Sequence, residues 1–212
     1  MEIYPSIASA DTLDLGGEIR RLGAWRNLHI DIEDGNFTPN ITFGLKTVES
    51  ICKVSEAKQK QVHLMVTSPV DFILPLRDCG VTEVIAHLEA MDNPVHFIRM
   101  CKESGMKAGL ALKAGSEIRM IEPFLDIIDS VLFLTSAPMP VKEYFSQDAF
   151  DNALAAAKLL AGNAALYADG GLMEEHLRIL NESGFDGVIL GRLVFNGADP
   201  FSNICHLNSI LE

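Results

Sequence analysis

Residues 80–112 read GVTEVIAHLEAMDNPVHFIRMCKESGMKAGLAL, and this stretch contains the unit that repeats along the chain. A short apolar run, Glu83–His87, is followed by a segment of helical period, Pro94–Ser104, and by a second apolar run, Ala108–Leu112. Gly105 follows the helical segment, as a glycine commonly does where a helix ends. Both runs are continuous rather than alternating, which is typical of parallel strands buried on both faces. The stretch therefore predicts a strand–helix–strand unit with parallel strands.

The same unit recurs along the whole sequence. We expect strands at Ile3–Ala8, Leu28–Ile32, Gln61–Val66, Glu83–His87, Ala108–Leu112, Ser130–Leu134, Ala164–Ala168 and Gly187–Leu190. Segments of helical period lie between them at Thr47–Val54, Val70–Cys79, Pro94–Ser104, Asp151–Leu160 and Glu174–Ser183. Eight such units predict an α/β fold, a (β/α)8 TIM barrel, and the chain is near the lower length limit for it. A doubly wound open sheet is less favoured because no GxGxxG loop follows the first run.

Composition limits the class of protein. The 212 residues contain no linker or charge block, so we expect one barrel domain over residues 1–212. The chain is 48% hydrophobic and 22% charged, which excludes intrinsic disorder, and no apolar run is long enough for a membrane span. A net charge of −12 disfavours nucleic acid and anionic membranes as partners. Scattered cysteines and the lack of a secretory signal favour a cytoplasmic location.

Ionisable residues gather at the predicted carboxyl ends of three strands, where barrel enzymes place their chemistry. His29, Asp31 and Glu33 are two apart on one strand and therefore share a face. His63 lies on the next strand, and Asp169 ends the seventh. Burying these groups together is costly unless something neutralises them. Two imidazoles and two carboxylates suit Zn²⁺, Mn²⁺ or Fe²⁺. The alternative is that the histidines are structural and the aspartate forms a turn.

Several motifs resemble those of the ribulose-phosphate 3-epimerase family of (β/α)8 barrels. Pro5–Asp11 resembles its opening PSILSAD motif, His29–Asn40 its HIDVMDGxFVPN motif, His63–Val66 its HLMV, His87–Ala90 its HxEA, Asp169–Gly171 its DGG turn, and Gly191 with Phe195 its GSAxF. These segments run from the first strand to the last. The resemblance implies a carbohydrate epimerase that inverts C3 of a ketose phosphate, either ribulose 5-phosphate or a related pentulose or hexulose phosphate.

The resemblance also implies a metal site and a pair of catalytic acids. One divalent ion (Zn, Mn, Fe or Co) would be bound by His29, Asp31, His63 and Asp169. Asp31 and Asp169 would exchange protons on opposite faces of an enediolate that the metal stabilises. The direction in which each aspartate acts stays unassigned. We expect a sugar-phosphate ligand and a homo-oligomer, either a dimer or a hexamer.

The substrate is expected to contact one set of residues around this centre. They are Ser6, Glu33, His63, Met65, Gly170, Gly171, Gly191 and Arg192. Ser6 would hydrogen-bond the substrate or a water at the metal site, and the alternative is a turn serine after Pro5. Glu33 stands where the family usually has methionine. Four roles are open for Glu33. It would act as a further metal ligand, bind a sugar hydroxyl, shift the acid–base balance of the site, or pair with a nearby cation and take no part in the chemistry. Leu134 also replaces a methionine, whereas Met65 keeps the family's residue.

The segment after the sixth strand departs from the family pattern. The family has NPGFGGQ there, whose backbone amides bind the substrate phosphate, and this chain reads TSAPMPVKEYF over 135–145. Pro138 and Pro140 have no amide hydrogen. We therefore expect Arg192, assisted by Lys142, to bind the phosphate. The alternative is a surface arginine paired with an acid.

Two other functions stay open. The altered segment motivates an epimerase or isomerase of an unphosphorylated or differently substituted sugar. A non-catalytic barrel that binds a sugar phosphate or a partner is the other possibility, and the metal-binding set argues against it.

Overall fold

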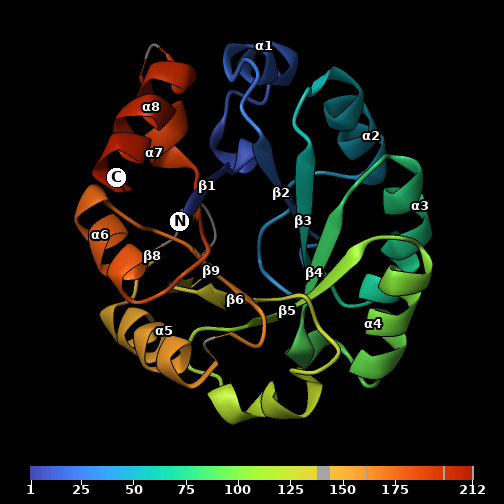
Figure 1. Cartoon of the computed structure of the whole chain (residues 1–212). Coiled ribbons are helices and arrows are strands. Elements are labelled where there is room, and N and C mark those ends of the chain that lie inside the picture. The colour runs from blue at the N-terminus through green and yellow to red at the C-terminus, as the bar shows by residue number, and fades with distance from the viewer. Residues whose placement is uncertain (138–143, 161, 198, 212) are drawn as a thin grey trace.

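The computed structural model describes residues 1–137, 144–160, 162–197 and 199–211. Eight parallel strands form one sheet in the order β1-β10-β9-β6-β5-β4-β3-β2, and helices surround it (Figure 1). The strands are β1 (Glu2–Pro5), β2 (Asn27–Glu33), β3 (Gln59–Met65), β4 (Glu83–His87), β5 (Lys107–Leu112), β6 (Ser130–Leu134), β9 (Ala165–Asp169) and β10 (Gly187–Leu190). A parallel bridge between Ser6 and His29 joins the end of β1 to β2. The predicted (β/α)8 barrel is confirmed.

The first strand is shorter than the sequence predicted. Strand β1 ends at Pro5, and Ile7–Ser9 forms a 3-10 helix instead of continuing the strand to Ala8. The pairing with β10 ends where Pro5 meets Leu190, because β10 itself ends there. The early end of β1 has a consequence for the site, since Ser6 is thereby placed over the carboxyl end of the barrel.

The helices follow the predicted segments in part. The predicted segments correspond to α2 (Leu45–Val54), α3 (Ile73–Asp78, after a 3-10 turn at Pro69–Phe72), α4 (Pro94–Glu103), α5 (Gln147–Leu160) and α6 (Glu174–Glu182). The structure adds α1 (Leu15–Arg21), α7 (Arg192–Phe195) and α8 (Pro200–Leu211). The connection between β5 and β6 contains two 3-10 helices, Ile118–Met120 and Glu122–Phe124. Pro123 lacks the amide hydrogen that a longer helix would need there.

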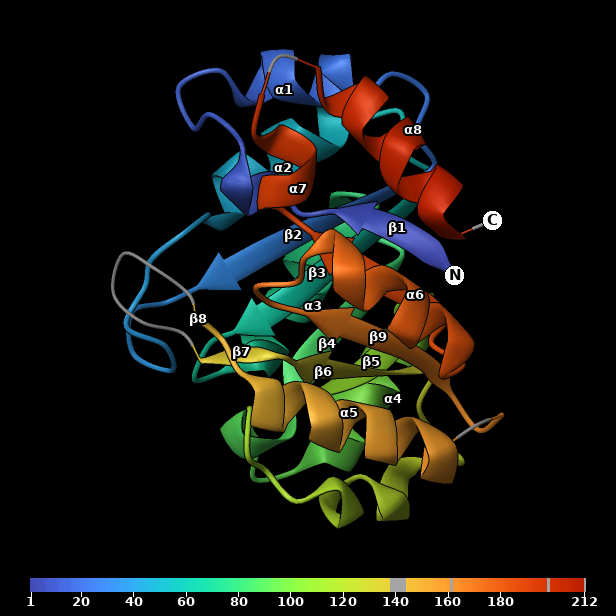
Figure 2. The same cartoon turned by 90° about the vertical axis from the view of Figure 1, so that its left-hand side faces the viewer.

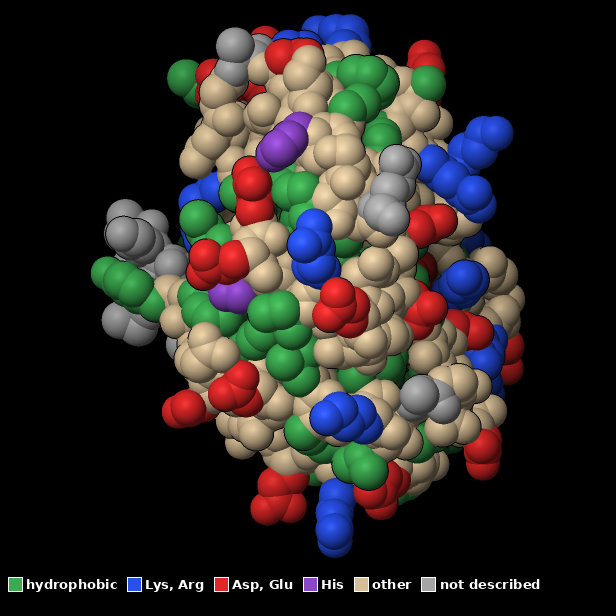
Figure 3. Space-filling model, turned by 60° about the vertical axis from the view of Figure 1, so that its left-hand side comes forward, with side chains coloured by type: hydrophobic (Ala, Val, Ile, Leu, Met, Phe, Trp, Pro, Cys, Tyr) green, Lys and Arg blue, Asp and Glu red, His purple; other side chains and the backbone are tan. Residues whose placement is uncertain are grey.

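Two apolar layers stabilise the barrel. A small cluster fills its interior and includes Tyr4, Ile85, Leu132 and Tyr167. A larger layer lies between the strands and the surrounding helices, where Phe97 of α4 is fully buried. Acidic and basic side chains are interspersed over the face shown in Figure 3. Among the described residues, no helix is long and apolar enough to cross a membrane.

The carboxyl ends of the strands carry the longer connections. Seen from the side, the arrowheads of the strands point toward one end of the barrel, where β7 and β8 also lie (Figure 2). Strands β7 (Ser136–Ala137) and β8 (Tyr144–Phe145) pair antiparallel just after β6. This hairpin stands where the sequence departs from the glycine-rich pattern.

Candidate active site

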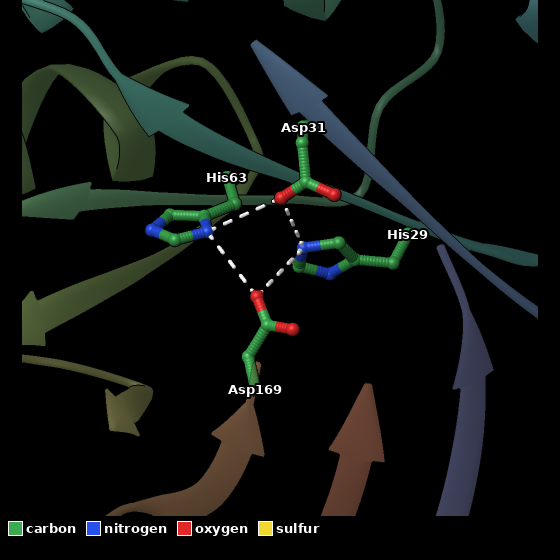
Figure 4. A group of neighbouring side chains, drawn as sticks. All are labelled: His29, Asp31, His63 and Asp169. Atoms are coloured by element: carbon green, nitrogen blue, oxygen red, sulfur yellow. Dashed lines mark hydrogen bonds and ion pairs between the residues drawn. The ribbon is translucent and has the colours of Figure 1, made fainter. Parts of the chain in front are cut away.

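Strands β2, β3 and β9 bring His29, Asp31, His63 and Asp169 together at the carboxyl end of the barrel (Figure 4). One donor atom from each residue lies within 4.8 Å of the donor atoms of the other three. The alternation of β2 points His29 and Asp31 to the barrel interior, and His63 is the register partner of Asp31 on β3. These are the four side chains that the sequence predicted as metal ligands.

The donor set fits a divalent cation. Asp31 Oδ1 lies 3.1 Å from His29 Nε2 and 3.4 Å from His63 Nδ1. Asp169 Oδ2 lies 3.6 Å from His63 Nδ1 and 3.9 Å from His29 Nε2. His63 Nδ1 is buried and accepts no hydrogen bond from the described residues. A buried nitrogen that faces two carboxylates without a hydrogen bond is what a metal ligand requires.

The charges of the cluster are strongly coupled. Burial disfavours the charged form of both histidines, but the neighbouring carboxylates outweigh burial and raise both pKa values, that of His63 to about 9. Burial also opposes ionisation of Asp31, but His29 and His63 hold its pKa below its usual range. A metal ion that binds here must therefore displace protons from the imidazoles.

Each histidine ligand has a polar partner on its far side. His29 Nδ1 lies 2.6 Å from Gln61 Oε1, and Gln61 Nε2 donates to Glu83 Oε2 at 2.9 Å. His63 Nε2 lies 3.0 Å from His87 Nε2. Burial lowers the pKa of His87 to about 4, so this ring is neutral. Gln61, Glu83 and His87 were not predicted as site residues. Strand alternation places them on the same face as the ligands, but their contacts with His29 and His63 run between different strands.

A cavity of about 470 Å³ opens above the cluster, and most of the predicted substrate-binding residues line it. Its lining includes Ser6, Glu33, Met65, Gly170, Gly171, Gly191 and Arg192, together with Asp31, Asp169 and Leu134. His63, which the sequence also predicted to contact substrate, lies behind this surface and is not part of the lining that the described residues form.

Ser6 orients one of the two aspartates. Its hydroxyl donates to Asp31 Oδ2 at 2.6 Å, so Ser6 is more than a turn residue after Pro5. Asp31 thus directs Oδ1 to the imidazoles and Oδ2 to Ser6. Asp169 directs Oδ2 to the imidazoles, and its Oδ1 points away from them (Figure 4).

Glu33 is buried beside the aspartates, and only 7% of it is exposed. Its Oε1 accepts hydrogen bonds from Thr38 Oγ1 at 3.3 Å and from Asn40 Nδ2 at 3.4 Å. Burial and the charge of Asp31 raise its pKa. Within the described residues Glu33 forms no ion pair, so the predicted alternative of a cation partner is not seen there.

The turn after β9 is fixed against the β7–β8 hairpin. Gly170 and Gly171 have φ angles of +107° and +67°, which favour glycine. A Cβ at Gly170 would collide with Ser136, and one at Gly171 would lie 3.0 Å from the backbone of Phe145. Thr135 donates from its amide to Asp169 O at 2.7 Å and from its hydroxyl to Gly170 O at 2.6 Å. These bonds set the position of Asp169.

Arg192 is the cationic side chain among the described cavity-lining residues, and it begins α7. It is exposed, and no described carboxylate forms an ion pair with it, so the predicted surface pair is not seen in this part of the chain. Lys142, Pro138 and Pro140, which entered the sequence prediction for the phosphate, lie outside the described residues.

Comparisons with known proteins agree on the family. Residues 2–195 match the model of the ribulose-phosphate 3 epimerase family. The chain is 32% identical over 211 residues to a ribulose-phosphate 3-epimerase of Mycobacterium tuberculosis, with 97% of this chain and 90% of the relative covered. It is 31% identical to the ribulose-phosphate 3-epimerase, cytoplasmic isoform, of Oryza sativa, over 100% of this chain and 94% of the relative.

A solved structure shows the same fold at low identity. The 3-hexulose-6-phosphate synthase of Salmonella typhimurium superimposes with a TM-score of 0.70 at 15% identity, with 100% of this chain and 98% of the synthase covered. At this identity the likeness concerns the barrel alone.

Proposed function

The chain belongs to the ribulose-phosphate 3-epimerase family of carbohydrate epimerases, and we propose that it inverts C3 of a ketose phosphate with the aid of one divalent ion. The observation that carries the proposal is the position of the four-residue cluster beneath the cavity. Asp31 and Asp169 belong both to that cluster and to the cavity surface. A sugar in the cavity would therefore touch the two carboxylates and a cation held between them.

His29, Asp31, His63 and Asp169 would hold the ion through the donor atoms that face one another. Nitrogen and oxygen ligands of this kind suit Zn, Mn, Fe or Co. When bound, the ion supplies positive charge that stabilises negative charge on the substrate's oxygens.

The two aspartates would move the proton. Inversion at carbon requires one group to remove a proton from one face and another group to return a proton to the opposite face. Asp31 and Asp169 come from β2 and β9 and approach the cluster from opposite directions (Figure 4). Each carboxylate has a second oxygen besides the one facing the imidazoles. Met65 and Leu134 add apolar surface to the same cavity, which limits water beside the reacting carbon.

Arg192 would bind the phosphate. It is exposed at the cavity without a carboxylate partner among the described residues, and a guanidinium binds phosphate oxygens through two parallel hydrogen bonds. Glu33 would bind a sugar hydroxyl, because Thr38 and Asn40 use its Oε1 and leave Oε2 without a hydrogen bond from the described residues. Gly170, Gly171 and Gly191 would contribute backbone to the cavity surface that faces the substrate.

Solvent deuterium exchange tests this proposal. The zinc- or manganese-loaded protein would be incubated in deuterated water with ribulose 5-phosphate, with hexulose phosphates and with the matching free ketoses. We expect deuterium to enter C3 of a ketose phosphate together with inversion, and we expect Asp169→Asn to slow both by about 10²- to 10⁴-fold. A folded, metal-loaded protein that exchanges C3 of none of these sugars would contradict the proposal and favour a non-catalytic barrel.

A second candidate is an epimerase of an unphosphorylated or differently substituted sugar. Pro138 and Pro140 favour it, because these residues cannot offer amide hydrogens to a phosphate. Faster exchange on a free ketose than on its phosphate would support this candidate over the first. For either candidate function we predict a cytoplasmic location and a homo-oligomer.

A further inference from the structure

His87 is a buried polar residue that the chemistry proposed above does not use. It ends β4, its exposure is 0%, and it is not part of the described cavity lining. The ring of Phe37 covers it, with 4.9 Å between the ring centroids. A polar ring buried in this way costs free energy unless its nitrogens are used. Its partners therefore indicate why the fold keeps it.

The nitrogen that His87 contacts belongs to His63. The two Nε2 atoms are 3.0 Å apart, so one carries a hydrogen and the other accepts it. His63 Nδ1 faces the carboxylates of Asp31 and Asp169 at 3.4 and 3.6 Å, and its other nitrogen points away from the cluster (Figure 4). A ring that ligates a metal through Nδ1 must carry its hydrogen on Nε2. His63 is therefore the donor and His87 the acceptor.

This assignment fixes the tautomer of His87. Its Nε2 accepts a hydrogen, so a neutral His87 carries its own hydrogen on Nδ1. That atom lies 3.4 Å from Glu89 Oε2. Glu89 is itself held in place, because its Oε1 accepts hydrogen bonds from the amide of Lys113, at 2.9 Å, and from the Ser116 hydroxyl. The contacts behind His63 therefore run from its ring to the ring of His87 and end at the carboxylate of Glu89.

The other histidine ligand has a comparable arrangement built from different groups. His29 Nδ1 lies 2.6 Å from Gln61 Oε1, and the amide nitrogen of Gln61 donates to Glu83. An amide oxygen can only accept, so His29 carries a hydrogen on Nδ1, and Nε2 is the nitrogen that would bind a metal once its proton is displaced. Both imidazoles are therefore oriented from behind by a neutral group that is backed by a carboxylate.

We propose that His87 and Glu89 are positioning residues that hold His63 in the Nε2–H tautomer and aim its Nδ1 at the metal site. This inference rests on the proposed function for the presence of the metal. Partners of this kind behind a metal-ligating histidine usually matter about 10- to 100-fold in metal affinity. His87 touches neither substrate nor metal, so its effect acts through the orientation and basicity of His63.

The first test reads the tautomers directly. The full chain, labelled with ¹⁵N in its histidines, would be studied by long-range ¹H–¹⁵N correlation without metal and with zinc. Substitution of each histidine in turn assigns the signals. We expect His87 to carry its hydrogen on Nδ1, and His63 to carry a hydrogen on Nε2, in both samples. A His87 ring with its hydrogen on Nε2 would overturn the proposal.

The second test compares zinc affinities by competition with a chelator. We expect His87→Leu and Glu89→Gln to bind zinc about 10- to 100-fold more weakly than the wild type. His87→Gln should recover most of this loss, because its amide can accept from His63 and donate to Glu89. Ile85→Val is the matched control, since Ile85 is fully buried on the same strand and has no polar group. Its affinity should equal that of the wild type.

The outcomes separate this inference from the proposed function. If His87→Leu does not fold, Glu89→Gln decides, because it leaves both rings in place. Folded His87→Leu or Glu89→Gln protein with wild-type zinc affinity would overturn the inference while leaving the metal site intact. A wild-type chain that binds no zinc would contradict the proposed function instead, and the tautomers of the metal-free protein would still decide the assignment of His87.

Discussion

The two ends of the cavity are built in different ways. At one end, the donor atoms of four residues on β2, β3 and β9 lie within 4.8 Å of one another, and buried groups support both histidines from behind. At the other end stands Arg192, an exposed side chain that begins a four-residue helix and lines the same cavity. Strands and buried hydrogen bonds fix the first end, whereas connections form the second.

This difference indicates which part of the function tolerates change. Moving a ligand on a strand would break hydrogen bonds of the sheet and expose or bury charge, so the metal end permits few substitutions. Connections on a barrel rim accept changes at low cost. We therefore expect a member of this family to keep the proton chemistry while its contacts to the rest of the substrate vary.

Asp169→Asn should produce the largest effect, because it removes one proton carrier and one anionic ligand. We expect kcat to fall by about 10²- to 10⁴-fold, the range usual for loss of a general acid or base. Deuterium entry at C3 measures this directly. Asp186→Asn, measured in the same assay, serves as a control because Asp186 does not line the cavity. Equal rates for Asp169→Asn and wild type would show that the end of the cavity with the four-residue cluster does not carry the proton chemistry.

Arg192→Ala tests the phosphate end. Loss of a charged hydrogen bond of about 1.5–3 kcal/mol should raise KM for a ketose phosphate roughly 10- to 100-fold and leave kcat nearly unchanged. The free ketose provides the control, because it has no phosphate to lose. An unchanged KM for the phosphate would show that another group binds it.

The metal end should depend on pH in a defined direction. The pKa of His63 is raised to about 9, so below that pH the ring holds a proton that the metal must displace. Metal affinity should therefore increase with pH up to about 9, by about tenfold per pH unit for each proton displaced. Calorimetry in two buffers of different ionisation enthalpy measures the protons released. A metal affinity that is flat between pH 7 and pH 8 would contradict this assignment.

Glu33→Met should have the smallest effect, because it changes one contact to the sugar and none of the four ligands. We expect KM to rise by roughly the tenfold that one hydrogen bond supplies, with metal content unchanged. Glu33→Gln keeps an acceptor for Thr38 and Asn40 and separates the charge from the hydrogen bond. Loss of metal in Glu33→Met would instead identify Glu33 as an additional ligand.

The sequence predicted the barrel and the four-residue cluster for a physical reason. His29 and Asp31 are two apart on a strand, and that spacing places both on one face whatever the rest of the chain does. His63 and Asp169 followed from their places at the carboxyl ends of two other predicted strands, and the motif resemblance agreed with all four residues. Ends of elements were less accurate, as shown by β1, which stops at Pro5 because its partner strand stops.

Other features depend on contacts between distant segments and could not be predicted. Gln61 and Glu83 act on His29 through hydrogen bonds across three strands, which no local pattern encodes. The first turn of helix α1 (Leu15–Arg21) contains Gly16 and Gly17, which lower its helix propensity. The side chain of Asp14 caps the helix by accepting from the Gly17 amide and so compensates for the two glycines. The contact between Thr135 and the Gly170 carbonyl likewise joins separate parts of the chain.

The function proposed above requires His29, Asp31, His63 and Asp169 to bind one divalent ion. The most direct test is elemental analysis of the desalted protein after incubation with Zn²⁺ or Mn²⁺, for wild type, His63→Ala, Asp169→Ala and Arg192→Ala. We predict about one ion per chain in wild type and Arg192→Ala, and almost none in the other two. A folded wild type without bound metal, or His63→Ala and Asp169→Ala variants that keep it, would contradict a metal site at these four residues.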